Sequence, residues 1–127
     1  MNISQAAHVA GLPVKTVRYY EDIGLVKAPA RSAAGYRQYD DDTVNKLNFV
    51  RRSRAFGFSI KECRELLGLY HDTARQSAHV KRIASKRLLE VQQKQRDLKA
   101  LHDELERLVN FCKGDQNPQC PIIDHLG

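Results

Sequence analysis

The sequence predicts a mainly α-helical fold, in which a helix-turn-helix with a small β-hairpin wing precedes a long helix and a short C-terminal loop. Proline and glycine cluster at 11–13, 24–35 and 114–121, and they divide the 127 residues into helical blocks. No proline or glycine occurs between residues 75 and 110, where apolar residues recur at spacings near 3.5. The length suits one domain, or a small domain with an appendage.

Two short helices are expected near the N-terminus, on either side of a glycine turn. The stretch "SQAAHVA" predicts a first helix with Ser4 at its N-cap, and Gly11 ends that helix. In the next stretch, "PVKTVRYYEDIG", the helical period turns the valines toward a core and leaves Lys15, Arg18 and Tyr19 outside. Two short helices joined by a tight turn are the sequence pattern of a helix-turn-helix.

The segment after the second helix has the composition of a hairpin. Short extended pieces near residues 25–27 and 36–39 flank a loop that contains Arg31, Ser32 and Gly35. Extended pieces bounded by glycine and proline are typical of short strands joined by a turn. We therefore expect a small β-hairpin wing in this segment.

Two further helices are expected after the wing. Three aspartates at 40–42 place negative charge at the positive end of a helix that Gly57 terminates. Ser59 and Glu62 have the spacing of a capping box at the start of the next helix. Cys63 lies in the first turn of that helix and is interpreted as a small buried hydrophobic residue, because free cysteine is among the most buried residue types.

The long segment without proline or glycine is predicted to form one helix of about 35 residues, which spans roughly 50 Å. An intermittent apolar stripe runs along it at Val80, Ala84, Val91, Leu98, Leu101, Leu105 and Leu108. A helix of this length is too long to pack on so small a domain, so we expect its stripe to pair with a second copy in a two-helix coiled coil. The chain is therefore expected to form a homodimer.

Charge and composition favour a nucleic-acid partner over a membrane or an enzymatic role. The formal net charge is +6, and the first 60 residues hold nine basic and five acidic side chains. A basic half that also contains aromatic residues favours binding to nucleic acid. No run of about twenty apolar residues and no secretory signal is visible, so we expect a cytoplasmic protein. No nucleophile–base arrangement or phosphate-cradling glycine loop indicates an enzyme.

Two of the three cysteines, Cys112 and Cys120, flank a loop of seven residues near the C-terminus. Such a pair could bind a metal, form a redox switch or simply pack. Cytoplasmic thiols stay reduced, which favours metal or redox chemistry over a structural disulfide. Gly114 can close the long helix, and Pro121 begins a short helix whose N-terminus stabilises a thiolate at Cys120.

Three motifs, "VRYYEDIGLV" (17–26), "RSAAGYRQYD" (31–40) and "RSRAFGFSIKE" (52–62), strongly resemble the MerR family of bacterial transcriptional activators. The resemblance covers essentially the whole chain. The ending "CPII" and the spacing of the Cys112–Cys120 pair resemble the copper-efflux branch of that family, which responds to Cu(I), Ag(I) and Au(I).

The resemblance implies three parts with separate tasks. Residues 1–71 are expected to form a winged helix-turn-helix DNA-binding domain, 72–111 an antiparallel coiled-coil dimerisation helix, and 112–127 a metal-binding loop with a short terminal helix. Dimers of this family bind a promoter whose −35 and −10 elements are too far apart for RNA polymerase. With inducer they bend and undertwist the DNA and realign those elements, whereas the apo-protein represses.

The residues expected to contact DNA share an outward position on the second helix, on the wing or on the helix that follows. They are Lys15, Thr16, Arg18, Tyr19, Arg31, Tyr36, Arg37 and Arg54. Arginine can read guanine edges in the major groove or grip phosphate, and phosphate contacts make the affinity depend on salt.

Cys112 and Cys120 are the expected metal ligands. Two thiolates without a third soft ligand suit a two-coordinate monovalent ion, whereas zinc normally takes four ligands. His125 is expected to lie at the surface or in a hydrogen bond, not to bind the ion. Ser77 stands where divalent sensors of the family typically have a cysteine, so the resemblance implies that it excludes divalent ions.

Two functions other than a monovalent-metal-responsive transcription regulator are possible. Within the same fold, the alternative is a sensor of a divalent metal or of thiol oxidation. A cytosolic metallochaperone fits poorly, because it would not need a DNA-reading half.

Overall fold

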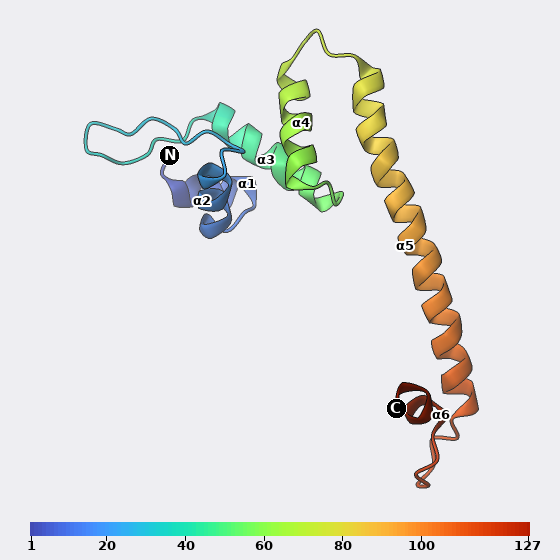
Figure 1. Cartoon of the computed structure of the whole chain (residues 1–127). Helices are drawn as coiled ribbons and strands as arrows, with labels where there is room; N and C mark the ends of the chain where they lie inside the picture. The colour runs from blue at the N-terminus through green and yellow to red at the C-terminus, as the bar shows by residue number, and fades with distance from the viewer. The chain divides into compact units, whose positions relative to one another are not determined.

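The computed structural model describes all 127 residues, and it is mainly α-helical, as the sequence predicts. The chain divides into two compact units, Met1–Ala84 and Ser85–Gly127 (Figure 1). The helices in chain order are α1 (Ile3–Ala10), α2 (Val14–Asp22), α3 (Asp41–Ala55), α4 (Ile60–His71), α5 (Ser77–Phe111) and α6 (Pro121–Leu126). None of these helices has the length and apolar content that crossing a membrane requires.

The first helix, α1, starts directly after Asn2. The Asn2 side chain accepts a hydrogen bond from the Gln5 amide at 2.8 Å, and the Gln5 side chain accepts one from the Asn2 amide at 2.9 Å. This reciprocal pair is a capping box, so the prediction of Ser4 as the N-cap is wrong. Ser4 lies inside the first turn, because the helix begins before it. Gly11 ends α1 at a φ of 71°, a left-handed conformation that glycine adopts without steric cost.

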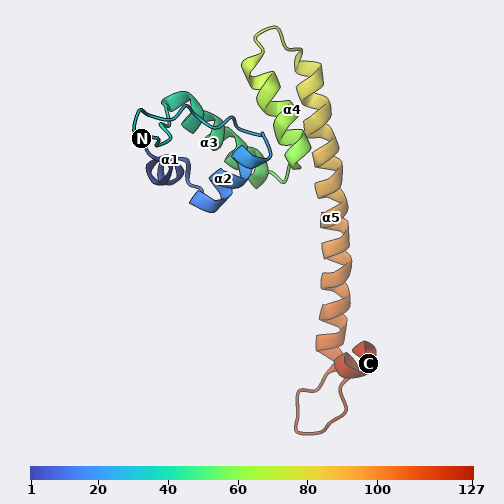
Figure 2. The ribbon, with the colours of Figure 1, turned by 60° about the vertical axis from the view of Figure 1, so that its left-hand side comes forward.

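The core of the first unit lies among α1, α2, α3 and α4 (Figure 2). α1 packs against α2 and α3, and α3 packs against α4. The largest fully buried side chains are Leu47, Val17, Val26, Val50 and Cys63. Burying one valine or leucine side chain contributes about 1.5–3 kcal/mol. This apolar contact holds one face of α2 against the rest of the unit and leaves the opposite face to solvent.

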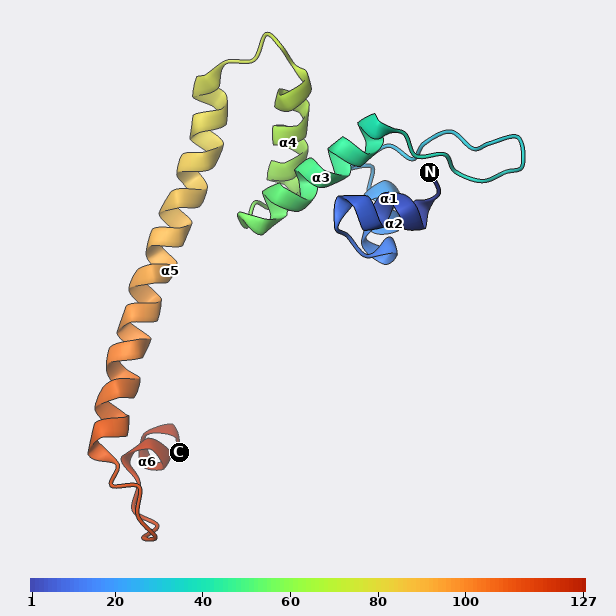
Figure 3. The same cartoon turned by 180° about the vertical axis from the view of Figure 1, so that it is seen from behind.

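The wing (residues 27–39) is an extended loop between α2 and α3 (Figure 3). It contains one isolated antiparallel bridge, between Arg31 and Arg37, in place of the two short strands that the sequence predicts. The chain just before the wing forms no strand, because it turns back onto α2. There the Val26 amide donates to the Tyr20 carbonyl at 3.2 Å, and the Val26 side chain is buried.

The predicted starts of α3 and α4 are confirmed. The Asp40 side chain accepts a hydrogen bond from the Thr43 amide at 2.8 Å at the start of α3. The Ser59 side chain accepts one from the Glu62 amide at 3.1 Å, and the reciprocal bond completes the capping box of α4. Cys63 is fully buried, as expected, and burial raises the pKa of its thiol.

Arg64 joins α4 to the end of α2. Its guanidinium donates to the Ile23 carbonyl at 3.0 Å and to the Gly24 carbonyl at 2.9 Å. Carbonyls at the C-terminal end of a helix lack partners within the helix, and a charged donor makes a stronger bond to them than a neutral one. Arg64 therefore fixes the C-terminal end of α2.

The helix α5 is uninterrupted from Ser77 to Phe111, which confirms the single long helix that the sequence predicts. Within the second unit, Leu98, Leu101 and Leu105 are 66%, 53% and 47% exposed. An apolar row that its own chain leaves open is a surface suited to another apolar surface.

Candidate DNA interface and metal site

The outward face of α2 carries the side chains that the sequence assigned to DNA reading. Lys15, Arg18 and Tyr19 are exposed, and Thr16 is half-buried. Val17 is fully buried on the inward face, and the helical period places Lys15, Arg18 and Tyr19 away from that face. The structure thus presents Lys15, Arg18 and Tyr19 on a helix that its buried face holds in place.

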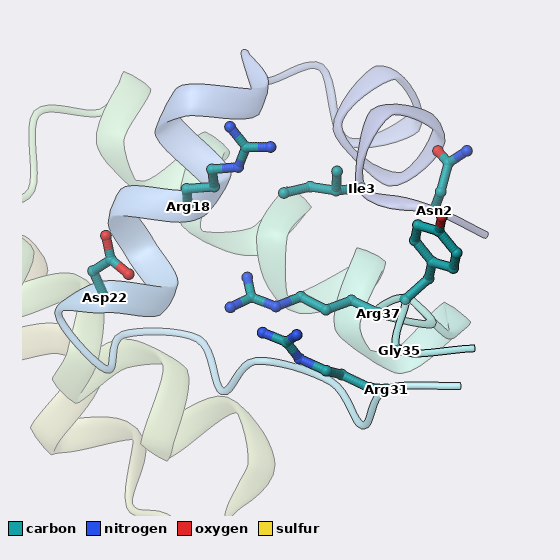
Figure 4. A pocket seen from close by; sticks show the side chains of 8 residues that line it. Asn2, Ile3, Arg18, Asp22, Arg31, Gly35 and Arg37 are labelled. Carbon is teal, nitrogen blue, oxygen red and sulfur yellow. The ribbon is translucent and has the colours of Figure 1, made fainter. Parts of the chain in front are cut away.

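A hollow of about 330 Å³ lies between α2 and the wing. Figure 4 shows Arg31 and Arg37 extending from the wing toward the space that Arg18 borders from α2. Asp22 and Tyr36 also line the hollow, and Tyr36 is 72% exposed. Three guanidinium groups around one hollow form a positive surface suited to an anionic partner.

Arg37 is also ion-paired within the chain. Its guanidinium donates to the carboxylate of Glu21 on α2, and the Tyr39 hydroxyl donates to the other oxygen of the same carboxylate. The Glu21 side chain is only 2% exposed. Burial, and then the hydrogen bond to Glu21, raises the pKa of Tyr39 to about 12, so the phenol stays a donor at neutral pH.

Sequence reasoning missed Glu21. The signal that could have found it is its position, because Glu21 follows Val14 and Val17 at helical spacing on the inward face of α2. An acidic residue on such a face needs a partner, since an unpaired buried charge is costly.

Arg54 lies apart from the residues that line the hollow. Its guanidinium donates to the Phe58 carbonyl at 2.7 Å, across the turn between α3 and α4. Lys15, Thr16 and Tyr19 are likewise outside the lining of the hollow. Contact with DNA stays a prediction for these four residues, as it does for Arg18, Arg31, Tyr36 and Arg37.

The two C-terminal cysteines lie face to face in the second unit. Cys112 directly follows α5, and its amide donates to the Leu108 carbonyl at 3.1 Å. Gly114 then turns the chain with a φ of 64°. The return brings Cys120, the N-cap of α6, to a distance of 3.2 Å between the two sulfur atoms.

The two thiols differ in acidity. The pKa of Cys120 is lowered, first by a hydrogen bond from the Ile123 amide, then by the Cys112 thiol and the Ile122 amide. The pKa of Cys112 is raised, mainly because it shares its hydrogen with Cys120. Cys120 is therefore the thiol that ionises first.

The chain brings no third ligand to this pair. No group of three or more histidine, cysteine, aspartate or glutamate side chains is positioned to hold a metal ion. His125 is hydrogen-bonded as expected, with its Nε2 atom 2.7 Å from Oε1 of Glu104. Ser77 is the exposed first residue of α5 and belongs to the first unit. Cys112 and Cys120 alone offer two soft sulfur ligands, which fit a thiophilic ion that replaces the hydrogen bond between them.

A helix-turn-helix with a basic wing defines the class of a DNA-binding regulator. The family "MerR HTH family regulatory protein" matches residues 1–69, and "MerR, DNA binding" matches residues 44–108. The chain belongs to the MerR family of helix-turn-helix transcriptional regulators, which are DNA-binding proteins and not enzymes.

Several relatives match nearly the whole chain. The transcriptional regulator HmrR of Rhizobium leguminosarum bv. viciae is 51% identical over 126 residues, which cover 99% of this chain and 97% of the relative. The regulator CueR of Escherichia coli O6:H1 is 41% identical over 126 residues, with coverages of 99% and 93%.

A solved structure shows the same fold. The transcription regulator PbrR691 from Ralstonia metallidurans CH34, in complex with lead(II), matches with a TM-score of 0.83 and 33% identity. The match covers 100% of this chain and 99% of that one.

The order of thiol ionisation predicts an order of alkylation in the metal-free, reduced protein. With limiting iodoacetamide at about pH 7.5, we expect Cys120 to be labelled before Cys112, because the thiolate is the reactive form. Buried Cys63 should react only on unfolding. Peptide mass spectrometry over a time course measures the order. Faster labelling of Cys112 than of Cys120 would contradict the assigned acidities.

Proposed function

We propose that this chain senses a monovalent ion of the Cu(I) class through Cys112 and Cys120, and activates efflux or detoxification genes by distorting their promoter. The observation that supports this most directly is the pair of sulfurs 3.2 Å apart, without a third ligand from the chain. Cu(I), and with it Ag(I) and Au(I), favours soft thiolate ligands, whereas zinc sites usually have four ligands.

Charge supports the same choice of ion. Two thiolates and a +1 ion leave a net charge of −1, which the Ile122 and Ile123 amides at Cys120 help to stabilise. A divalent ion would be neutralised by the two thiolates but would lack the further ligands that it normally takes.

In this proposal residues 1–71 bind the promoter. Arg18 on the open face of α2 reads base edges in the major groove, and Arg31 and Arg37 contact phosphates from the wing. The hollow between α2 and the wing, bordered by these three arginines, supports this assignment.

Residues 72–111 would join two copies. The exposed Leu98, Leu101 and Leu105 of α5 supply an apolar row for the α5 of a second copy. From the family resemblance we infer that the two α5 helices run antiparallel. The same resemblance implies RNA polymerase as a further partner at the promoter. A regulator of this kind acts in the cytoplasm, where its thiols stay reduced.

The relatives support a metal inducer but leave two candidate ions. The transcriptional regulators HmrR and CueR match this chain at 51% and 41% identity, and the cysteine motif resembles the copper-efflux branch of the family. PbrR691, at 33% identity, was solved with lead(II), which makes a divalent ion the second candidate. We expect Ser77 to favour the monovalent ion, because divalent sensors of the family typically have a cysteine at this position.

The three cysteines are predicted to have separate roles. Cys112→Ser or Cys120→Ser should leave operator binding intact and abolish metal-dependent transcription, because each removes one of two ligands. Cys63→Ser is the matched control, and it should keep the metal response while losing stability from its buried hydroxyl. In vitro transcription with Cu(I) under reducing conditions measures the response. Loss of metal binding in Cys63→Ser would show that the metal site is assigned wrongly.

The unmodified protein is predicted to respond to Cu(I), Ag(I) and Au(I) and not to Zn(II) or Hg(II). Ser77→Cys should begin to admit divalent ions, because it adds a soft ligand at the position where divalent sensors of the family have one. Ser77→Ala is the control and should leave the ion preference unchanged. In vitro transcription with each ion in turn is the measurement. Strong activation of the unmodified protein by Zn(II) would contradict the two-ligand site.

A further inference from the structure

The wing is tied to α2 through one buried carboxylate. Glu21 accepts hydrogen bonds from Arg37 and Tyr39, so a single side chain of α2 holds two residues of the wing. We propose that Glu21 is a positioning residue, which sets the place of the wing relative to α2 and thereby the specificity of DNA binding. This inference rests on the proposed DNA surface and is independent of the metal.

The burial of Glu21 shows that its role is internal. Its side chain is 2% exposed, whereas Arg37 is 34% exposed and keeps part of its guanidinium open to the hollow. Arginine has five N–H donors in a rigid fork, so Arg37 can be held by Glu21 and still donate to a second anion. Glu21 thus orients the Arg37 guanidinium toward the proposed DNA surface, while Glu21 itself stays buried.

The Tyr39 side of the network makes the anchor rigid. The Tyr39 ring is buried in the core of the first unit, and its hydroxyl donates to the Glu21 carboxylate. The backbone hydrogen bonds of the wing join it to itself and, at Tyr39, to Met1, whose amino and carbonyl groups bond to the carbonyl and amide of Tyr39. Glu21 supplies the side-chain restraint that ties the wing to α2 itself.

Restraint and charge act on DNA binding in different ways. A fixed separation between the recognition helix and the wing lets base contacts and phosphate contacts form together only in one register. The Glu21 charge also offsets that of Arg37, which weakens sequence-independent attraction to phosphate. Loss of Glu21 should therefore strengthen non-specific binding and weaken the preference for the operator.

Glu21→Gln and Asp22→Asn form a matched pair for the test. Each removes one negative charge next to the same hollow, but exposed Asp22 accepts no hydrogen bond from the wing. The probes are a duplex selected from a random pool with the wild-type protein and a scrambled duplex of the same composition. Affinities for both are measured by fluorescence anisotropy over a series of salt concentrations.

For Glu21→Gln we expect the ratio of operator to scrambled affinity to fall about tenfold, within the range of specificity changes at protein–DNA interfaces. The slope of log affinity against log salt concentration for the scrambled duplex should steepen by about one, because the Glu21 charge no longer offsets that of Arg37. Asp22→Asn should strengthen binding to both duplexes alike and leave the ratio unchanged. Equal ratios in the two variants would overturn the inference.

A second comparison shows whether Glu21 acts through Arg37. In an Arg37→Gln background, Glu21→Gln should lower the ratio by much less than tenfold and leave the salt dependence unchanged, because only the contact with Tyr39 remains to be lost. The same tenfold loss in that background would also overturn the inference. Tyr39→Phe keeps the buried ring and removes one donor, so it should lower the ratio in the same direction by a smaller factor, even if Glu21→Gln folds poorly.

A separate variant, Arg18→Ala, tests the proposed DNA surface itself. Arg18→Ala should weaken operator binding by about five- to 150-fold, since it removes a proposed base contact. Unchanged binding in Arg18→Ala would refute the proposed surface, whatever Glu21→Gln does. Weakened binding in Arg18→Ala with an unchanged ratio in Glu21→Gln would refute only the positioning role.

Discussion

The burial of Val17 under the apolar core is the constraint on which the DNA-reading half depends. Val17 and Leu47 are fully buried, so α2 cannot rotate about its axis without exposing apolar surface. With α2 held in this orientation, the helical period places Arg18 on the exposed face. Arg64 fixes the end of the same helix, and Glu21 fixes the wing to it. The side chains that we propose to contact DNA are thus held in place by contacts that α2 makes within the first unit.

The second unit brings two free, half-buried thiols together. Gly114 and the short helix α6 return the chain, and the backbone amides at the start of α6 lower the pKa of Cys120. The pKa of the other thiol, Cys112, is raised, so Cys112 stays protonated to higher pH than Cys120. In the proposed metal site, one sulfur is already prepared as a ligand, and the second would lose its proton as the ion binds.

Local signals in the sequence predicted most of the fold. The acidic start of α3, the cap at Ser59 and the burial of Cys63 follow from short-range spacing, and each is confirmed. The wing strands were overpredicted, because short extended pieces cannot show whether they find a pairing partner. The Glu21–Arg37 pair was missed for a related reason. Its members are 16 residues apart, and only the packed fold brings a charged group on the inner face of α2 beside the wing.

The central claim is that two sulfurs, and nothing else, hold the ion. Copper K-edge X-ray absorption of the reduced, Cu(I)-loaded protein tests it directly, because the method counts and identifies the atoms bound to copper. The account predicts one shell of two sulfur atoms and no nitrogen or oxygen ligand, with the signal lost in Cys112→Ser. A shell of three or more sulfurs, or a histidine nitrogen bound to copper, would contradict it.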